Sequence, residues 1–514
     1  MQKIITIDPL TRIEGHLKFT TKIVDSVVVD AKCSAQLYRG IEKALIGYDA
    51  RVAQQVTQRI CGTCNYAHAE AAALALEDAM NIKPNKNGQL LRNLIVGAYQ
   101  VHDYLFHFYL LCVFDFIDVK TIVNYKGTDN NLLKLKKWVE TEQKSKKIFP
   151  MSPFLPKFKA IYSQNNNLNF FSINNYIEAF NIMVKLDKAV AIFGGKSPHP
   201  VTIEAGGVTT IPTLLALEKY KKLLDEVQKF VDEKYLPNIM KIAQEFKEYF
   251  HIGKGYANYL AFSYFPDENG NNHLFTGGVV LDGKYGNYDL DKIQEDIKYA
   301  YYEDTGHTKP LSNTKLTPIN YAQYKKEQSK KNGKYSWSKA PRYDTNVMEV
   351  GPIARIIVTY KSGKNPRLNA FVDKINTQLN ISFENYNSVM GRHLSRAIIS
   401  HTIIEKLQDD LKRVEPNVSA YKENEVPKNA KGIGLTEGTR GSLAHWIETD
   451  KAGFIKNYEL IVPTTWNISP RDSKGTPGVV EKMLIGTKIK DINNPIELAR
   501  IIRSTDPCMA CSVH

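Results

Sequence analysis

The chain ends with "RSTDPCMACSVH" (residues 503–514), and a second C-x-x-C pair lies far upstream in "RICGTCNYAHAE" (residues 59–70). Two such pairs are typical of a metal or redox site. Four thiolates suit tetrahedral zinc, and an iron–sulfur cluster is the other generic option. Cys64 and Cys508 are 444 positions apart, and closing such a loop costs on the order of 6 kcal/mol. A local zinc module would not need that loop, so we expect the two ends of the chain to meet at a functional site.

The composition is that of a large folded protein. Of 514 residues, 43% are hydrophobic and 10% are aromatic, enough to bury a large core. The net charge is +14, but the lysines are scattered among polar residues. The sequence has no zinc-finger spacing and no aromatic–basic RNA-binding motif. We therefore expect a solvated basic surface and no nucleic-acid partner.

Membrane and disulfide signals are weak. The N-terminus has no secretory signal, and the longest apolar stretch, "FYLLCVFDFIDV" (108–119), is interrupted by Asp115. Membrane association or export must then come through a partner. The six cysteines are too few for a disulfide scaffold. Cys33 and Cys112 stand alone among apolar neighbours, and we expect them to be small buried hydrophobes.

Hydrophobic periodicity predicts an α+β fold that is predominantly helical. The N-terminus alternates as strands on either side of the turn "DPLTRIEG", and residues 120–172 are rich in Lys and Asn, which suggests a surface insertion without clear periodicity. We expect one large unit over 1–514, with a core bundle of long helices and small peripheral β-sheets. Its N- and C-terminal segments should meet at a buried metal site. Helical patterns cover residues 42–60, 65–80, 90–116, 173–194, 213–250 and 366–413, with mixed turns at 254–345.

The last segment carries signals for helix starts. In "NPIE" (494–497) Asn can cap, Pro can take the first helical position and Glu the third. In "DPC" (506–508) Asp506 can cap and Pro507 can open a turn. Cys508, Cys511 and His514 then share one side of a helical tail, and a helix N-terminus lowers the pKa of a nearby thiol. The tail therefore predicts a prepared metal site.

Further motifs accompany both cysteine pairs in a fixed order along the chain. Together they resemble the large, catalytic subunit of nickel–iron hydrogenases, and the overall pattern is nearest to the membrane-associated uptake type, which oxidises H2. The resemblance covers the chain end to end except for 120–172 and parts of 254–330. The motifs are "DPLTRIEGHL" (8–17), "YRGIE" (38–42), "RICGTCxxxH" (59–68), "HFY" (107–109), "YSWSKAPRYDTNVMEVGPIAR" (335–355), "TRGSLAHWI" (439–447), "YELIVPTTWNISPRD" (458–472) and "DPCxxCxxH" (506–514).

This resemblance implies reversible, heterolytic cleavage of H2 at a thiolate-bridged nickel–iron centre. Cys61, Cys64, Cys508 and Cys511 would bind nickel, and Cys64 and Cys511 would also bind iron, which carries carbon monoxide and cyanide. Thiolates select soft or borderline metals, which agrees with this centre. The resemblance also implies a separate ion near the C-terminus, held by Glu42, the carbonyl of Leu460 and His514. That ion is usually magnesium, with iron as the alternative.

Proton-handling residues follow from the same motifs. Cys508 is the first candidate for the base and Arg440 the second, because a guanidinium is normally fully protonated. Asp103 and Asp506 match the acids that surround Arg440, where they would stay ionised and orient it. Glu14 matches the glutamate at the proton exit.

Two residues would support the centre from outside, and two others depart from the common pattern. His68 would hydrogen-bond the bridging sulfur, and Thr464 would hydrogen-bond one cyanide. Tyr104 stands where many relatives have histidine, and Thr439 where proline is frequent. Neither departure touches an expected metal ligand.

Partners follow because no cysteines remain for an iron–sulfur cluster in this chain. The resemblance implies an iron–sulfur small subunit, in a heterodimer or a multiple of it, together with maturation proteins and a peptidase that cuts after His514. A membrane cytochrome b is a further candidate, and the expected place is the periplasmic side of the membrane, with the cytoplasm left open. The alternatives are a non-catalytic relative of quinone-reducing complexes, which generally lacks the four cysteines, and a structural zinc or scaffold protein.

Overall fold

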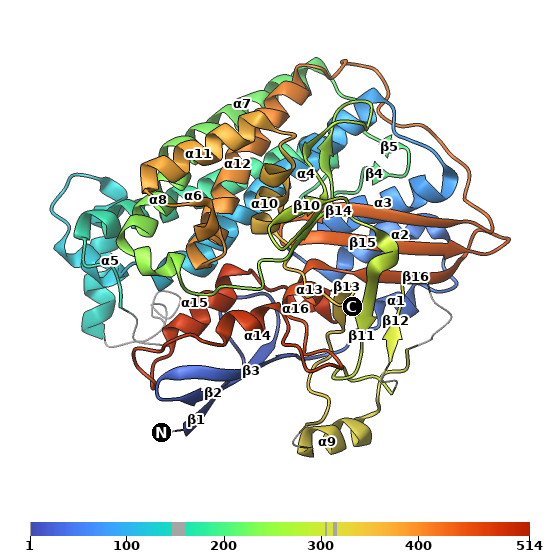
Figure 1. The fold of residues 1–514 in the computed structure, drawn as a ribbon. Coiled ribbons are helices and arrows are strands. Elements are labelled where there is room, and N and C mark those ends of the chain that lie inside the picture. The colour runs from blue at the N-terminus through green and yellow to red at the C-terminus, as the bar shows by residue number, and fades with distance from the viewer. Residues whose placement is uncertain (1, 146–160, 304–305, 312–315, 331) are drawn as a thin grey trace.

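The computed structural model describes residues 2–145, 161–303, 306–311, 316–330 and 332–514. Long helices pack together on one side of the molecule, and Figure 1 shows the β-sheets beside and below them. The helices are α1 (Ile41–Ala44), α2 (Ala53–Thr57), α3 (Asn65–Met80), α4 (Lys86–Phe106), α5 (Asn130–Ser145), α6 (Asn166–Gly194), α7 (Leu214–Phe230), α8 (Leu236–Glu245), α9 (Tyr321–Ser329), α10 (Pro352–Ser362), α11 (Pro366–Leu379), α12 (Val389–Leu411), α13 (Pro463–Asn467), α14 (Val479–Leu484), α15 (Ile496–Ser504) and α16 (Met509–Ser512).

The strands form small antiparallel sheets, in the orders β1–β2–β3, β10–β9–β6, β12–β11–β13 and β14–β15–β16, with β4–β5 and β7–β8 as pairs. Their bounds are β1 (Gln2–Ile7), β2 (Leu17–Val24), β3 (Val27–Ala35), β4 (Ile203–Glu204), β5 (Gly207–Val208), β6 (Tyr259–Ala261), β7 (Tyr264–Pro266), β8 (His273–Phe275), β9 (Gly278–Leu281), β10 (Lys284–Gly286), β11 (Ile293–Asp296), β12 (His307–Thr308), β13 (Ala340–Tyr343), β14 (Lys431–Gly438), β15 (Gly441–Thr449) and β16 (Ile455–Ile461).

The predicted fold class is confirmed, with a helical core and small sheets. The N-terminal strands, α3 and α4 lie where the sequence patterns predicted them. One sheet lies deeper than expected, because almost every residue of β15 is buried. Strand β15 is the middle strand of its sheet and so has no free edge, and α3, α10, α13 and β6 also contact it.

Helix α3 packs unusually closely against β14, and small residues on both elements permit this. The helix is rich in alanine, and β14 carries Gly432 and Gly434 at the contact. A Cβ atom at Gly434 would lie 1.9 Å from the backbone oxygen of Ala71, and one at Gly432 would lie 2.1 Å from that of Ala75. Glycine is therefore required for the approach. The contact fixes the start of α3, and with it Cys64, against the hairpin of β14 and β15.

The C-terminal segment folds back beside the N-terminal strands. In Figure 1 the red helices α14 and α15 lie directly above the blue strands β2 and β3. Backbone hydrogen bonds join them: Val28 N donates to Thr487 O at 3.0 Å, and Gly486 N donates to Val28 O at 2.8 Å. The expected meeting of the two ends of the chain is therefore confirmed.

The predicted caps of the last helices are wrong in detail. Helix α15 begins one residue later than expected, with Pro495 at the N-cap and no side-chain cap bond. Asp506 caps nothing, because its carboxylate accepts a hydrogen bond from Arg440 instead. Cys508 takes the N-cap of α16, which ends at Ser512, so His514 lies beyond the helix. For Asp506, a tertiary partner has thus replaced the local capping bond.

Two further segments differ from the sequence patterns. Residues 130–145 form helix α5 within the stretch expected to lack periodicity, while residues 146–160 of that stretch lie outside the described residues. Helix α10 was not expected, although Gly351 and Pro352 mark its start. Proline at the first helical position is favourable because its missing N–H would have had no helical partner.

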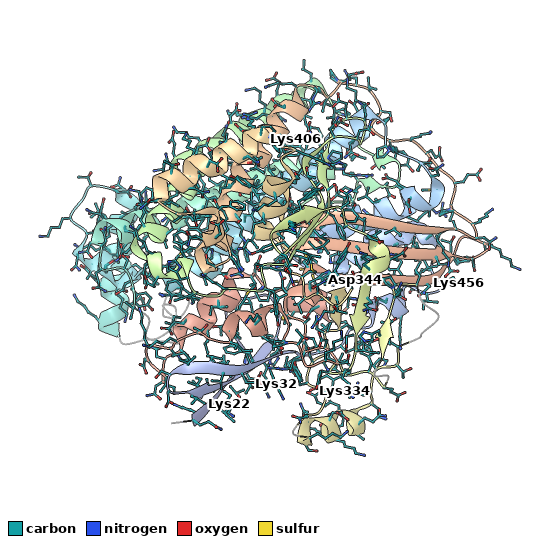
Figure 2. All side chains as sticks on the ribbon, in the orientation of Figure 1. Lys22, Lys32, Lys334, Asp344, Lys406 and Lys456 are labelled. Atoms are coloured by element: carbon teal, nitrogen blue, oxygen red, sulfur yellow. The ribbon has the colours of Figure 1, made fainter. Side chains whose placement is uncertain are left out.

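Labelled charged side chains lie at separate places on the molecule in Figure 2. Figure 2 places Lys22 near the N-terminal strands and Lys456 at the far end of the β14–β16 sheet. This spread is consistent with a solvated basic surface rather than one charged patch. Within the residues that the structure describes, none of the helices has the length and apolar character needed to cross a membrane.

Gly434→Ala should destabilise the protein by about 3 kcal/mol, because overpacking at a backbone contact forces α3 and β14 apart. Thermal melting checks this prediction. The matched control is Gly286→Ala on β10, where the nearest atom to an added Cβ is Val279 Cγ2 at 3.8 Å. A Gly434 variant that melts like the Gly286 variant would show that the contact does not require glycine.

Glu70 should make stability depend on pH. Its carboxylate accepts a hydrogen bond from Thr436 Oγ1 at 2.6 Å, and burial raises its pKa to about 7. The folded state then holds a proton that the unfolded chain releases near pH 4.5, so this contribution to stability is complete below that pH and is lost as the pH rises through 7. Between pH 5 and pH 8, the free energy of unfolding of Glu70→Gln should therefore rise by about 2 kcal/mol relative to that of wild type.

Melting curves at both pH values test the Glu70 prediction. The control is Glu425→Gln, a change at an exposed carboxylate, which should show the same pH dependence as wild type. An identical pH dependence for the Glu70 variant and wild type would contradict the prediction.

Candidate metal centre

The four paired cysteines meet at one buried point. Cys61 follows the turn at the end of α2, and Cys64 forms the N-cap of α3. The Sγ atoms of Cys61 and Cys508 are 3.2 Å apart, as are those of Cys64 and Cys511, and Cys508 and Cys511 are 2.9 Å apart. All four sulfur atoms lie within 4.8 Å of one another, and all four cysteines are free and buried. This donor set fits soft or borderline metals.

The turn at Glu14 holds the C-terminal pair in place. Glu14 and Cys508 form an isolated parallel bridge, and Met509 N donates to Glu14 O at 3.0 Å. The Glu14 carboxylate also lies beside the cysteine, with Oε2 3.2 Å from Cys508 Sγ and accepting from Ala510 N at 2.9 Å. Glu14 thus contacts both the backbone and the thiol of the tail, while its side chain remains only partly buried. The structure brings this predicted residue to the cysteines.

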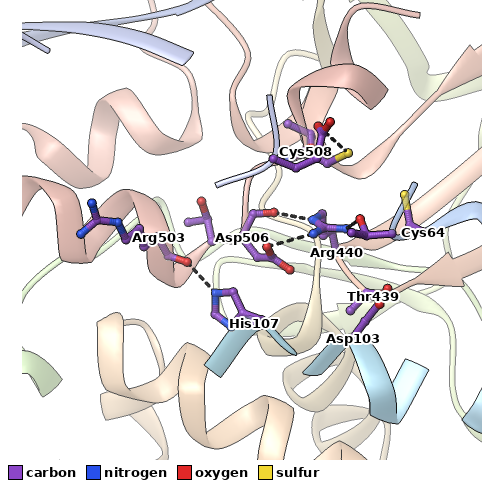
Figure 3. Close-up of polar contacts among 12 residues, drawn as sticks. Cys64, Asp103, His107, Thr439, Arg440, Arg503, Asp506 and Cys508 are labelled. Atoms are coloured by element: carbon purple, nitrogen blue, oxygen red, sulfur yellow. Dashed lines mark hydrogen bonds and ion pairs between the residues drawn. The ribbon is translucent and has the colours of Figure 1, made fainter. Parts of the chain in front are cut away.

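Arg440 lies beside the cysteines at the tip of a hairpin. Gly438 pairs with Gly441, so Thr439 and Arg440 form the turn between β14 and β15. The Arg440 guanidinium donates to the backbone oxygen of Asp506 at 2.8 Å, to its carboxylate at 3.1 Å and to Thr63 Oγ1 at 3.1 Å. Figure 3 shows it between Asp506 and Cys64. Burial alone would lower the pKa of Arg440, but Asp506 raises it well above its ordinary value, so the side chain is a fixed cation.

Asp103 does not pair directly with Arg440, contrary to the sequence prediction. Its Oδ2 accepts a hydrogen bond from Thr439 Oγ1 at 2.8 Å, as Figure 3 shows, and Tyr66 Oη lies 2.7 Å from the same hydroxyl. Burial raises the pKa of Asp103. The threonine that departs from the common pattern is therefore the residue that Asp103 contacts, one position before Arg440. Asp506 alone fulfils the predicted ion pair.

The two predicted supporting residues both reach the cysteines. His68 Nε2 lies 3.6 Å from Cys511 Sγ, and Thr464 Oγ1 accepts from Cys508 N at 3.1 Å. A small cavity opens beside the sulfur atoms. Its lining includes Cys64, Cys511, His68, Arg440, Pro463 and Thr464. The residues therefore leave space next to the thiols and line it with the Arg440 cation and two threonines, Thr439 and Thr464.

A second group of donors lies where the chain ends. His514 Nε2 is 3.4 Å from Glu42 Oε1, is buried, and has no hydrogen-bond partner among the described residues. Burial would raise the pKa of Glu42, but Lys339 and His514 lower it to about 2, so the carboxylate is ionised. Glu42 and Lys339 also line a cavity of ≈ 730 Å³, and Mg²⁺ usually keeps several water ligands. Leu460 lies beside Glu42, because its N–H donates to Glu42 Oε1 at 2.9 Å.

A third group, His107, Cys112 and His393, also places donor atoms within 4.8 Å of one another. His107 Nε2 donates to Arg503 O at 2.7 Å and lies 3.2 Å from Cys112 Sγ. Burial lowers the pKa of both histidines well below its ordinary value, and the buried Arg396 lowers it further. The positive charge of Arg396 disfavours a metal cation there. Cys112 is buried as predicted, with the His107 ring as a polar contact.

Several residues of the site were not predicted as functional. Arg39 donates to the carbonyl of Arg59 at 2.9 Å and to that of Ile60, and its own N–H donates to Val513 O at 3.0 Å. It therefore ties the first cysteine motif to the tail. His445 is the second such residue, because its Nε2 lies 3.1 Å from His68 Nδ1. Arg39 belongs to the motif "YRGIE" and His445 to "TRGSLAHWI", but the spacing of a motif does not reveal which distant residues its side chains contact.

Comparisons with known proteins find hydrogenase relatives that match along nearly the whole chain. The profile of the family described as "Nickel-dependent hydrogenase" matches residues 39–514, and one described as "HoxL-like" matches residues 4–30. The periplasmic NiFeSe hydrogenase large subunit of Desulfomicrobium baculatum is 35% identical over 99% of this chain and 94% of its own length. The uptake hydrogenase large subunit of Bradyrhizobium diazoefficiens is 33% identical over 100% and 95%.

Solved structures give the same result. The Ni-Fe-Se hydrogenase from D. vulgaris Hildenborough in the reduced state matches with a TM-score of 0.87 and 36% identity, and all of both chains is covered. The reduced, active form of the Ni-Fe-Se hydrogenase from Desulfomicrobium baculatum matches with a TM-score of 0.86 and 34% identity, again with both chains fully covered. The arrangement of long helices and small sheets is thus shared over the full length.

Proposed function

The chain belongs to the nickel-dependent hydrogenase family as its catalytic large subunit, and on that premise we propose that Cys61, Cys64, Cys508 and Cys511 hold a thiolate-bridged nickel–iron centre. Its activity is that of an oxidoreductase acting on hydrogen. The observation that carries the proposal is the convergence of four free, buried thiols from both ends of the chain. The alternatives of a non-catalytic relative or a zinc scaffold have no support from the comparisons.

The cysteines take different roles in this proposal. Cys64 and Cys511 would hold both nickel and iron, while Cys61 and Cys508 would hold nickel alone. When bound, the centre supplies two Lewis-acidic metals at which hydrogen is cleaved heterolytically, with carbon monoxide and cyanide as further ligands of iron. The cavity beside Cys64 and Cys511 gives such small ligands room, and Thr464 lines it.

The proton leaves through Cys508 and Glu14. Cys508 Sγ accepts it, and Glu14 Oε2, at 3.2 Å, is within reach to take it on. Glu14 is suited to the transfer because its carboxylate is held by Ala510 N beside the thiol while part of the side chain reaches solvent. Proton transfer therefore runs along the same turn that anchors the tail.

Arg440 acts by its charge and position. A cation paired with Asp506 and bonded to Thr63 is fully protonated, which leaves Cys508 as the base. Its charge favours the ionised form of the neighbouring thiols and of any anionic ligand in the cavity. Asp506 orients the guanidinium, and Asp103 holds the preceding residue, Thr439, in place.

We also propose a magnesium ion, or iron in its place, at Glu42 and His514. The ionised carboxylate and the unpartnered Nε2 support a cation there, although nitrogen is an unusual ligand for magnesium. The buried Lys339 lies 3.9 Å from Glu42 and 2.7 Å from Glu295. It would hold both carboxylates in place beside that ion. Leu460 would contribute its backbone.

The electron route requires a partner. We propose an iron–sulfur small subunit, in a heterodimer or a multiple of it, as the acceptor, because Cys33 and Cys112 are single buried cysteines that cannot hold a cluster. Maturation proteins and a C-terminal peptidase would assemble the centre. The relative named periplasmic supports a place on the periplasmic side, reached through the partner, with a membrane cytochrome b as a further candidate.

Metal analysis tests the centre. The purified enzyme should contain one nickel per chain together with iron at the centre, and infrared bands of iron-bound carbon monoxide and cyanide should be present. Cys511→Ser should lose both metals from this site, because it removes a sulfur shared by them. Cys33→Ser, a change at a buried cysteine outside the site, should keep them. One zinc per chain in wild type, without nickel or iron, would refute the proposal.

Glu14→Gln should lower hydrogen oxidation with a redox dye by about 100-fold, because proton transfer by a positioned carboxyl contributes at least that factor. Nickel content should not change. Asp8→Asn serves as the control on the same turn, since Asp8 pairs with His16 at the surface and not with the cysteines. Turnover of the Glu14 variant near wild type would rule out this carboxylate as the proton exit.

A further inference from the structure

A chain of hydrogen bonds leads away from Cys511 through three buried side chains. His68 Nε2 lies 3.6 Å from Cys511 Sγ, His68 Nδ1 lies 3.1 Å from His445 Nε2, and His445 Nδ1 lies 2.8 Å from Tyr458 Oη. The three side chains come from α3, β15 and β16 and are at most 1% exposed. One residue thus separates His445 from Cys511 and two separate Tyr458 from it, and neither His445 nor Tyr458 has a role in the mechanism above.

The geometry allows only one arrangement of protons along this chain. A neutral imidazole has one donor and one acceptor nitrogen, and a contact between two ring nitrogens needs one of each. A tyrosine hydroxyl keeps its proton at neutral pH, and the ring nitrogens of His445 face only another ring nitrogen and that hydroxyl, with no carboxylate to stabilise a buried cation, so His445 is neutral. Among the described residues the phenol has no other hydrogen-bond partner, and a buried donor left unpaired is unfavourable.

The direction of the chain follows from its outer end. Tyr458 Oη donates to His445 Nδ1, so His445 carries its proton on Nε2. His445 Nε2 then donates to His68 Nδ1, and His68 carries its proton on Nε2, where it points at Cys511 Sγ. With the opposite orientation, His68 would present a lone pair to the sulfur and Tyr458 would have no acceptor. The Tyr458 hydroxyl therefore determines the tautomer of His68, although the two residues are not in contact.

We propose that His445 and Tyr458 are positioning residues that hold an N–H of His68 on the sulfur of Cys511 and so reduce the electron density which that thiolate donates to the metals. This inference rests on the proposed nickel–iron centre. Hydrogen bonds to ligand sulfur atoms raise the reduction potential of a metal site, and the outer partner of a ligand-contacting histidine fixes its tautomer and orientation. The strand pair β15–β16 thereby acts on the centre without contacting it.

The test compares variants of the metal-loaded enzyme. Tyr458→Phe removes only the hydroxyl, His445→Leu removes the donor to His68, and His445→Gln retains an N–H that can reach it. The control is Tyr220→Phe, because Tyr220 is also fully buried and its hydroxyl donates to a backbone carbonyl, that of Leu94, at 2.8 Å. Nickel and iron content, the nickel midpoint potential from a redox titration followed by electron paramagnetic resonance, and the infrared bands of the iron ligands are measured for each variant.

We expect Tyr458→Phe to keep both metals, to shift the midpoint potential to lower values and to move the carbon monoxide band to lower frequency. His445→Leu should shift both further in the same direction, and His445→Gln should restore part of the shift. Tyr220→Phe should change neither the midpoint potential nor the carbon monoxide band, even if it lowers the melting temperature as much as Tyr458→Phe does. Wild-type potential and bands in both Tyr458→Phe and His445→Leu would overturn the inference, and so would loss of metal from Tyr458→Phe, which would mean a role in assembly. Absence of nickel and iron from wild type would instead refute the proposed centre.

Discussion

The contact between the Glu14 turn and the last seven residues is the constraint on which the site depends. Glu14 and Cys508 run side by side in a parallel bridge, and the turn can approach only because Gly15 has a φ of +76° and no side chain. A Cβ atom there would lie 2.8 Å from Met509 Cβ. The resulting position of Cys508 determines that of Cys511 three residues later. Two cysteine pairs from opposite ends of the chain thereby become one set of ligands.

The second requirement is that buried charges in this region are compensated. Arg440 is paired with Asp506, and Lys339 is paired with Glu295 and lies near Glu42. An unpaired charge at such depth would be strongly unfavourable, whereas a paired and hydrogen-bonded one is tolerated. Each of these pairs joins segments that are far apart in the sequence, so the charges also hold the geometry of the two proposed ion sites. Thiolates that bind metal add negative charge, which Arg440 is placed to balance.

Rigid elements anchor these groups, most of which lie at the ends of helices and strands or in the turns beside them. The close packing of α3 on β14 fixes Cys64 and His68 relative to the hairpin that presents Arg440. Strands β15 and β16 then place His445 and Tyr458 behind His68. A centre built on helices and strands keeps its donor atoms within narrow limits, which metal chemistry requires. The same packing explains why β14 carries glycines, which local propensity disfavours in a strand, where it faces the alanines of α3.

The sequence by itself determined the ligand types and the order of the main elements. The spacing of Cys61, Cys64, Cys508 and Cys511 indicated one thiolate site, and periodicity placed the N-terminal strands, α3 and α4, because these patterns are local. Only the tertiary structure decided that Asp103 contacts Thr439 rather than Arg440, that Asp506 pairs with Arg440 rather than capping a helix, and that His445 continues the chain from His68. These choices depend on which side chains from distant segments come within hydrogen-bonding distance. Sequence spacing holds no such information, since packing of the whole chain determines those distances.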